Sequence, residues 1–486
     1  MKKIKLFLGV LAVTLVFSIT NASAKTLTEA GYWSITEDED WTLTEDVDKQ
    51  IIIDGAKVTI DLNGNDIRGY IKDIIIIQNG ANVTIKGEGT IESTKHQTIN
   101  VTSGSTLTLE SGDIKSVETG VAIFDTSTFT MNGGTITTVD NNGIAGNGTA
   151  GRGGYTINFN GGTINANITS AGYVSCGIYH PNEGTLNITG GTINSSNGAG
   201  VVQRGGTLNV TGGIINTNGS STGKVGDSRV VVPASAIVVD KYAGYPAMNT
   251  LVTKISKDVV LNGSAGDIET LGDGVVVEVT GGIFTEKPQE EQIPEGYNAY
   301  KVLEGENKDK YVVANEEELV NTVADAMINK EDIDDDTVAL IEKTVEGKYN
   351  LLSFYDVSLI TVTDNDDVVG YVTETDESVK VTLGLPTEMP KLEEGYSRKY
   401  YVIRIHNGEA EIIKDVTDNG DGTVSFKSDK FSTYAIAYVD VKEETTTKTE
   451  NITNPQTGDS IISNVIIFTV SIVGTTIAIR KKELIK

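Results

Sequence analysis

Residues Thr185–Asn194 read TLNITGGTIN, and copies of this stretch recur along the first half of the chain. Apolar and polar residues alternate within it, so that Leu186 and Ile188 face one way and their polar neighbours the other. This period of two is typical of a strand with one buried face. A Gly-Gly pair then turns the chain, since glycine tolerates a positive φ, and Ile193 resumes the buried series.

The copies return at a nearly regular spacing. Close copies begin at Thr156 and Thr207, weaker ones at residues 83, 106 and 128, and a last clear one at Val276. The equivalent apolar positions are Leu107, Phe129, Ile157, Leu186, Leu208 and Val277. Their spacings are 22, 28, 29, 22 and 69 residues, and we interpret the last as three further coils. Short strands and turns repeating about every 23 residues predict a solenoid, because one such unit cannot bury its apolar face alone.

The repeat excludes two other repeat architectures. Helical repeats would need a period of 3.6 and helix caps, and a propeller blade needs about 40 residues. We therefore expect a mainly β chain with a right-handed parallel β-helix of about nine to eleven coils over residues 51–285, with coils about 4.8 Å apart. In the form of its repeat, this region resembles the pectate-lyase-like β-helix family.

Residues 1–24 carry the pattern of a secretory signal peptide. Three lysines precede an apolar run over residues 6–19, and Ala22 and Ala24 belong to a small-residue cleavage site. About 14 apolar residues are too few to favour a stable membrane span. We expect the mature chain to begin near Lys25.

Residues 25–50 precede the first clear coil and hold both tryptophans. The end of a solenoid exposes backbone and core, so it needs a cap. We expect Trp33 and Trp41 to cover this end, with stacking on a sugar as the alternative.

The other end carries Asn454-Pro455-Gln456-Thr457-Gly458, an apolar run over residues 461–479 and a basic tail. The run is long enough to span a bilayer, and the tail fits a cytoplasmic stop. Residues 454–486 resemble a Gram-positive sortase sorting signal of the LPXTG type, with Asn454 in place of the commoner leucine. The resemblance implies that sortase cuts after Thr457 and links it to peptidoglycan. A plain C-terminal membrane anchor is the alternative.

The composition changes after the last repeat, where a proline- and glutamate-rich stretch begins at Thr285. We expect residues 286–440 to form a β-sandwich, because strand patterns dominate from Tyr349 onward. A small helical element is expected within 316–345, where apolar residues have helical spacing. The region resembles a wall-proximal β-sandwich module that is loosely similar to ZU5-type domains. Residues 441–453 read as a charged, threonine-rich linker.

The 486-residue chain has 67 acidic and 39 basic side chains, a formal net charge of −28. Such a chain repels nucleic acid, so no nucleic-acid partner is expected. The single cysteine excludes an internal disulfide framework. Because Cys176 alternates with Val174 and Ile178, we expect it to face the solenoid core.

The family resemblance raises the question of polysaccharide cleavage. Galacturonan hydrolases of this fold use clustered aspartates, Gly-His-Gly and Arg-Ile-Lys, and none of these occurs here. One constellation remains, a predicted row at the turn before the repeat strand on successive coils. Its members are Asp125, Asn147, His180, Arg204 and Asp240. In register, Asp125, His180 and Arg204 would be the candidate catalytic residues, able to bind an anionic sugar or to perform acid–base chemistry.

Two further places are candidates for binding. Tyr242 and Tyr245 lie in a predicted loop, and loops on a rigid scaffold are where binding usually occurs; a plain insertion is the alternative. The aspartates at 332, 334 and 336 resemble the start of a calcium loop, but the following glycine and the bidentate glutamate are missing. We expect no metal and no other cofactor, with calcium as the alternative.

Together these patterns predict a secreted protein anchored to the cell wall on the surface of a Gram-positive bacterium. Its precursor is held in the membrane by residues 461–479. Sortase and peptidoglycan are the expected partners, and the β-helix is expected to act as an adhesin or binding module for glycans or host surface molecules, and not as an enzyme. The alternatives are a wall-tethered polysaccharide lyase or glycoside hydrolase, and a purely structural stalk.

Overall fold

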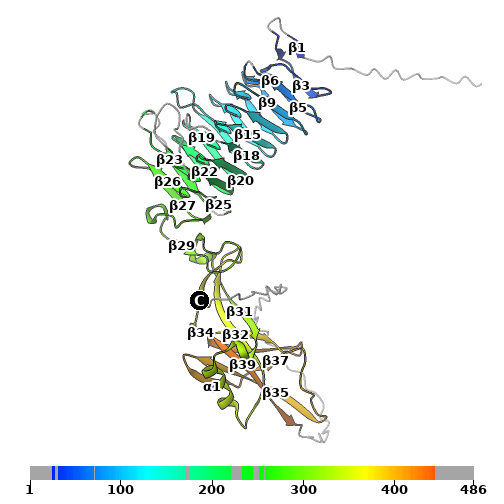
Figure 1. Ribbon diagram of the computed structural model, residues 1–486, viewed down its shortest axis with the longest axis vertical. Coiled ribbons are helices and arrows are strands. Elements are labelled where there is room, and N and C mark those ends of the chain that lie inside the picture. The colour runs from blue at the N-terminus through cyan, green and yellow to red at the C-terminus, as the bar shows by residue number, and fades with distance from the viewer. Residues whose placement is uncertain are drawn as a thin grey trace, which may run out of the picture. The chain divides into compact units, whose positions relative to one another are not determined.

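A computed structural model of the chain describes residues 25–27, 31–70, 72–167, 169, 176–219, 232–242, 244, 251–256 and 258–443 (Figure 1). Within these ranges the chain is mainly β and contains one α-helix. The chain divides into two compact units, one of residues up to 389 with 400–439, the other of 390–399 with the chain from 440. The predicted signal peptide and sorting signal lie outside the described residues. No helix in the described ranges has the length and apolar character of a membrane span.

A first sheet takes one strand from each repeat. Its strands are β1 (Lys25–Leu27), β2 (Trp33–Ile35), β4 (Ile51–Asp54), β7 (Ile75–Gln78), β10 (Ile99–Val101), β13 (Val121–Ile123), β16 (Ile144–Ala145), β19 (Ile178–His180), β21 (Val201–Gln203), β23 (Ile237–Asp240) and β26 (Ile268–Leu271). Apart from β1, each strand pairs in parallel with the strand one repeat away.

A second sheet takes two strands from each repeat, one on each side of the glycine turn. Before the turn lie β3 (Glu39–Thr42), β5 (Lys57–Asp61), β8 (Asn82–Lys86), β11 (Thr106–Leu109), β14 (Thr128–Met131), β17 (Tyr155–Phe159), β24 (Leu251–Ile255) and β27 (Val276–Val279). After the turn lie β6 (Ile67–Gly69), β9 (Thr90–Ser93), β12 (Asp113–Ser116), β15 (Thr135–Val139), β18 (Thr163–Asn167), β25 (Val259–Asn262) and β28 (Ile283–Phe284). The long strands β20 (Gly184–Ser196) and β22 (Gly206–Asn218) run through both positions, and Figure 1 shows them stacked beside β15 and β18.

The strand register confirms the predicted equivalence of the repeats. Leu186 pairs with Ile157 on one side and with Leu208 on the other. The interpretation of the 69-residue gap as three coils is wrong. Only Thr253 lies between Leu208 and Val277 in the register, so two coils span the gap. The extra length falls between β22 and β24, within residues 219–250, of which 220–231, 243 and 245–250 lie outside the described residues. The parallel pairing is compatible with a β-helix.

Inward side chains from the three strands of each repeat form one continuous hydrophobic core. In a single repeat Ile123, Phe129 and Ile136 are all completely buried. Burying each such side chain stabilises the fold by about 1.5–3 kcal/mol. The turn between the two strands needs glycine, because Gly191 has φ of +78° and a Cβ there would lie 2.6 Å from the ring of Phe159.

The first strands close one end of this core. β1 pairs antiparallel with β2, and Trp41 is buried in the core with its ring centroid 5.1 Å from that of Trp33. Both tryptophans lie in strands of the parallel stack, because β2 pairs with β4 and β3 pairs with β5, so residues 33–42 are part of a repeat and not a separate segment before the first one. At the last repeat, β28 pairs antiparallel with β30 (Tyr311–Asn315), and β30 in turn pairs antiparallel with β29 (Tyr297–Lys301). Short 3₁₀ turns precede β29 at η2 (Glu290–Gln292) and follow β30 at η3 (Glu316–Glu318), and a third, η4 (Lys330–Asp332), lies farther along the chain.

The remaining strands form two further sheets. One contains β31 (Val320–Ile328), β32 (Asn350–Val362), β33 (Val368–Val372), β39 (Thr433–Lys442), β35 (Tyr396–His406) and β36 (Glu409–Ile413). The other contains β34 (Glu374–Gly384), β38 (Thr423–Lys430) and β37 (Thr417–Asp418). Tyr355 from the first and Phe426 from the second meet in one buried cluster. Helix α1 (Asp335–Val345) packs Ile341 against Ile403 in a separate cluster.

One part of the expected helical element is wrong. Residues 320–328 form strand β31, which pairs antiparallel with β32 and places Val323 opposite Leu359. The apolar spacing also fits a strand here, and pairing with β32 decides between the two. The helix begins only after Asp334, whose carboxylate accepts a hydrogen bond of 2.8 Å from the N–H of Thr337.

The second compact unit contains a charged pair of its own. Arg398 donates two hydrogen bonds, of 2.7 and 2.8 Å, to the two carboxylate oxygens of Asp440. The same guanidinium donates to the carbonyl of Pro390 at 2.9 Å. This bidentate pair lowers the pKa of Asp440.

Candidate functional site

The predicted catalytic row is only partly in register. His180 pairs with Gln203 on the next repeat, and the pairing of Ile144 with Ile178 aligns Gly146 with His180 on the preceding one. Asn147 and Asp125 therefore do not line up with His180, and that part of the predicted row is wrong. Arg204 does not line up with His180 either, because His180 pairs with Gln203. Arg204 and Asp240 line up with each other, because Gln203 pairs with Val239 in the strands before them.

His180 is sealed inside the stacked repeats. Its side chain is completely buried, and its ring meets the ring of Tyr155 edge-on at 5.4 Å. Neither ring nitrogen has a hydrogen bond of good geometry to another described residue. Burial lowers the pKa of His180 to about 4, although a nearby backbone group at Gly184 opposes the shift. The imidazole is therefore neutral at pH 7 and has no path to a ligand on the surface.

Asp125 and Asn147 lie nearer the surface, in turns. The carboxylate of Asp125 accepts hydrogen bonds from the hydroxyl of Thr102 at 2.7 Å and from Arg152 at 3.0 Å. Asn147 is exposed, and its carbonyl accepts from the amide of Asn182 at 2.7 Å. Both residues stabilise turns between neighbouring repeats, and among the described residues neither is hydrogen-bonded to the ring of His180.

Arg204 and Asp240 form a buried ion pair. The exposed fractions of the two side chains are 0% and 7%, and two guanidinium nitrogens lie 2.7 and 2.8 Å from one carboxylate oxygen. The ring of Tyr242 lies 4.4 Å from the guanidinium carbon, and Tyr179 accepts a further hydrogen bond at 3.4 Å. Tyr242 thus covers an ion pair of its own chain. Tyr245, the other predicted ligand contact, lies outside the described residues.

Cys176 is buried as predicted, but it does not face the solenoid core. It belongs to a smaller cluster with Tyr179, Val202 and Val238, which alternate with core residues along the first sheet and so lie on the sheet's other side. The thiol lies 3.1 Å from the side-chain oxygen of Asn142. Burial raises the pKa of Cys176, so the thiol stays protonated and unreactive at pH 7.

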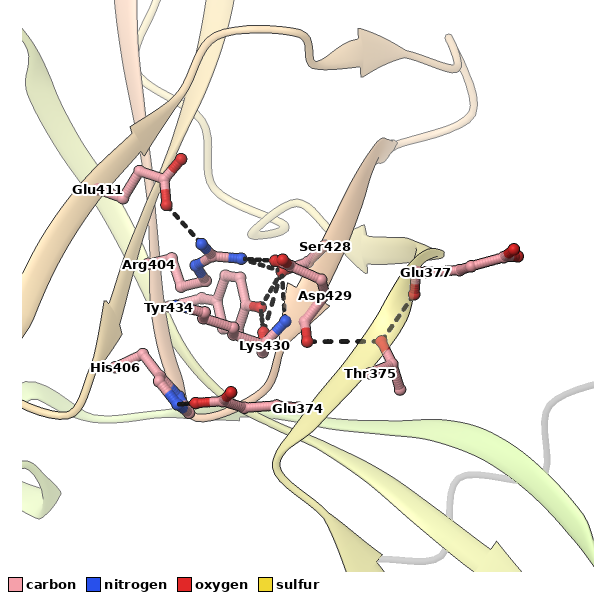
Figure 2. Close-up of polar contacts among 10 residues, drawn as sticks. All are labelled: Glu374, Thr375, Glu377, Arg404, His406, Glu411, Ser428, Asp429, Lys430 and Tyr434. Atoms are coloured by element: carbon pink, nitrogen blue, oxygen red, sulfur yellow. Dashed lines mark hydrogen bonds and ion pairs between the residues drawn. The ribbon is translucent and has the colours of Figure 1, made fainter.

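A polar network that the sequence did not predict surrounds Arg404 on β35 (Figure 2). The guanidinium donates to the hydroxyl of Ser428 at 2.8 Å and to the carboxylate of Asp429 at 2.6 Å, and it also pairs with Glu411. The hydroxyls of Ser428 and Tyr434 lie 2.7 Å apart. Through its hydrogen bond, Arg404 lowers the pKa of Asp429.

A second pair lies beside this network. The Nε2 atom of His406 lies 2.8 Å from the carboxylate of Glu374, which joins β35 to the start of β34 (Figure 2). The only sequence signal for either group is a charged or polar residue within an otherwise apolar strand pattern. The groups consist of paired side chains that hold strands together, and such pairs are a common structural device.

One of the three aspartates that resemble the start of a calcium loop has another role. Asp334 caps α1, and its hydrogen bond from Thr337 lowers the pKa of its carboxyl. Asp418 and Asp421 accept backbone N–H bonds within the hairpin between β37 and β38. Across the described ranges, no three acidic, histidine or cysteine side chains gather closely enough to hold a metal ion.

The most regular exposed feature is a set of hydroxyl and amide side chains on β11, β14, β17, β20 and β22. We name it the hydroxyl–amide face. Its members are Thr106, Thr108, Thr128, Thr130, Thr156, Asn158, Thr185, Asn187, Thr207 and Asn209. All ten are half-buried, and they form two rows of five across successive repeats. They alternate with the core residues of the same strands, so their side chains point outward.

One row of this face is a hydrogen-bonded ladder. Asn209 donates to Asn187 at 2.9 Å, Asn187 donates to Asn158 at 2.9 Å, and Asn158 donates to the hydroxyl of Thr130 at 3.2 Å. Every amide in the row therefore points its donated N–H toward the preceding repeat. A second ladder of the same polarity runs on the strands after the glycine turn. Its members are Asn262, Asn216, Asn194 and Asn165.

Comparison with known protein families, with curated proteins and with solved structures gives no match. The functional argument therefore rests on the residues themselves.

Proposed function

We propose that this chain is a secreted, sortase-anchored surface protein of a Gram-positive bacterium that binds glycans or host surface molecules without cleaving them. In this proposal the stacked repeats are a right-handed parallel β-helix, displayed on a wall-proximal β-sandwich. Residues 1–24 direct secretion, and residues 454–486 direct attachment of Thr457 to peptidoglycan.

The observation that carries the proposal is the contrast between the buried and the exposed chemistry of the repeats. His180 is buried without a route to solvent, and Arg204 is occupied by Asp240. The outward rows instead present hydroxyls and amides, which donate and accept hydrogen bonds but do not ionise near pH 7. A rigid scaffold with such a surface supports binding better than acid–base catalysis.

Anchoring is tested in a Gram-positive host that has a sortase and produces the full chain. We expect the chain in the fraction released by digesting the wall. Thr457→Ala should move it to the membrane fraction, whereas the control Ser460→Ala, which lies outside the pentapeptide, should not. Equal membrane retention of wild type and Thr457→Ala would contradict anchoring through Thr457.

Binding is tested with cells displaying the chain on plant, mucin and bacterial polysaccharides. We expect more retention than for cells that lack the chain, and no new reducing or unsaturated sugar ends. New ends that depend on the displayed chain would make the protein an enzyme. Equal retention of both cell types on every polysaccharide and on host surface protein would remove the binding function and leave a stalk.

A further inference from the structure

The hydroxyl–amide face lacks charge in a strongly acidic chain. None of its five strands contains an aspartate, glutamate, lysine or arginine, although the chain carries a net charge of −28. Charged residues border it on the neighbouring strands, with Lys86 on β8 and Lys254 on β24. The face therefore offers no charged side chain that could pair with an ionic ligand, and its only polar groups are neutral.

The face also has hydrogen-bonding capacity to spare. An asparagine amide has two N–H donors and an oxygen with two lone pairs. Within the ladder Asn187 gives one N–H to Asn158 and accepts one from Asn209, so one donor and one lone pair remain. In the other row, the hydroxyls of Thr156 and Thr185 make no hydrogen bond to any residue in the described part of the chain.

The dimensions of the face decide between kinds of partner. Five repeats about 4.8 Å apart give a length of about 19 Å, and two positions on one strand give a width of about 7 Å. A strip this narrow is far smaller than the roughly 800 Å² that each partner contributes to a standard protein interface. It matches a single extended polymer chain that runs across the strands. No aromatic side chain is among its ten members, so recognition must come from hydrogen bonds and not from stacking.

We infer that the hydroxyl–amide face binds one extended, neutral polysaccharide chain along the stack of repeats. Successive sugar residues advance by a length close to one repeat, so each repeat can offer one hydroxyl and one amide or hydroxyl to one sugar. The inference rests on the proposed binding function and assigns it a ligand class and a surface. Anionic polysaccharides are not expected on this face, because its five strands carry no cation to pair with them and the chain as a whole is acidic.

The test uses the purified full chain in native gels containing either hydroxyethylcellulose, which is neutral, or polygalacturonate, which is anionic. We expect hydroxyethylcellulose to retard the chain and polygalacturonate not to. The triple change Thr156→Val, Thr185→Val and Thr207→Val removes three hydroxyls and keeps β-branched side chains and charge. Losing three hydrogen bonds should weaken binding at least about tenfold.

A second variant tests the inference even if the first variant fails to fold. Changing Asn158, Asn187 and Asn209 to Thr extends the row in the form that the chain already uses at Thr108 and Thr130. It should keep the Tm and still weaken binding, because the spare amide donors are lost. The matched control is Thr135→Val with Thr163→Val and Thr192→Val, which changes three half-buried threonines that pair in register after the glycine turn, outside the face. The control should bind as wild type does.

The outcomes separate this inference from the function on which it rests. Wild-type retardation that both face variants retain would overturn the inference and leave the binding function intact. A wild-type chain that hydroxyethylcellulose does not retard would also overturn it, and the binding function would stand if displaying cells were retained on another polysaccharide. Face variants that lose binding while the control keeps it would support it.

Discussion

The guanidinium of Arg204 lies 2.7 Å from the carboxylate of Asp240, and the two side chains have exposed fractions of only 0% and 7%. They come from neighbouring repeats of the first sheet, 36 residues apart in sequence. The pair therefore joins two repeats from outside the hydrophobic core. Tyr242 covers this pair, so its ring has a structural role in the folded chain.

Removing one partner of this pair should be costly. Asp240→Asn leaves a buried guanidinium without its counter-charge, and we expect a loss of about 3–5 kcal/mol in the free energy of unfolding. Arg204→Met combined with Asp240→Leu removes both charges, and this double variant should lose much less. Urea unfolding measures both. A double variant as unstable as Asp240→Asn would show that the cost comes from packing rather than from the unpaired charge.

His180 should make the repeats sensitive to mild acid. Its pKa is about 4 in the folded chain and 6.5 as the ordinary value, so the unfolded chain binds the proton more readily between these pH values. Stability should therefore fall as the pH falls from about 6.5 to about 4, by on the order of 3 kcal/mol. His180→Gln should abolish this part of the pH dependence of the Tm. An unchanged profile in that variant would assign the acid sensitivity to other groups.

Gly146 should not tolerate a side chain. A Cβ there would lie 2.0 Å from the hydroxyl oxygen of Tyr155 and 2.3 Å from the ring carbon that carries it. Because Tyr155 is completely buried, its ring has little room to move. We expect Gly146→Ala to cost about 1–3 kcal/mol of unfolding free energy.

The matched control is Gly384→Ala, since a Cβ at that glycine meets no atom within 4 Å. It should change the free energy of unfolding by less than about 0.5 kcal/mol. Equal losses in the two variants would indicate a backbone effect common to glycine, and not a clash with Tyr155.

Arg404 should be more important to its sheets than any one of its acidic partners. It joins Ser428, Asp429 and Glu411, whereas Glu411 is 62% exposed and largely solvated. We expect Arg404→Gln to lower the free energy of unfolding by about 1–3 kcal/mol, because Ser428 and Asp429 lose a charged donor. Glu411→Gln should change it by less than about 1 kcal/mol. Thermal unfolding compares the two, and equal losses would refute this ranking.

Much of the repeat region was predictable from sequence, because its signal is local and recurs. The alternation around Leu186 fixes which side chains point inward, and its recurrence at Ile157 and Leu208 fixes which strands become neighbours. Both features depend on short stretches of chain and on glycine turns. Their agreement over many copies compensates for the weakness of any one of them.

The errors arose where the repeat is interrupted. Insertions between the repeats changed the register of Asp125 and Asn147 relative to His180, and spacing alone does not reveal where an insertion is placed. Cys176 precedes strand β19, so the alternation that fits Ile178 does not extend to it. The Arg404 network joins strands far apart in sequence, and no local pattern contains that pairing.

The parallel register from Thr185 to Asn218 has a consequence for how such a chain can change in length. One repeat of 22 residues superimposes its core, its glycine turn and its amides on the next without altering either neighbour. Duplicating or deleting such a unit would therefore move the two ends of the stack apart or together by about 4.8 Å while the interfaces stay the same. Duplication or deletion of one repeat in the gene would thus lengthen or shorten the stack by one step, at little cost to folding.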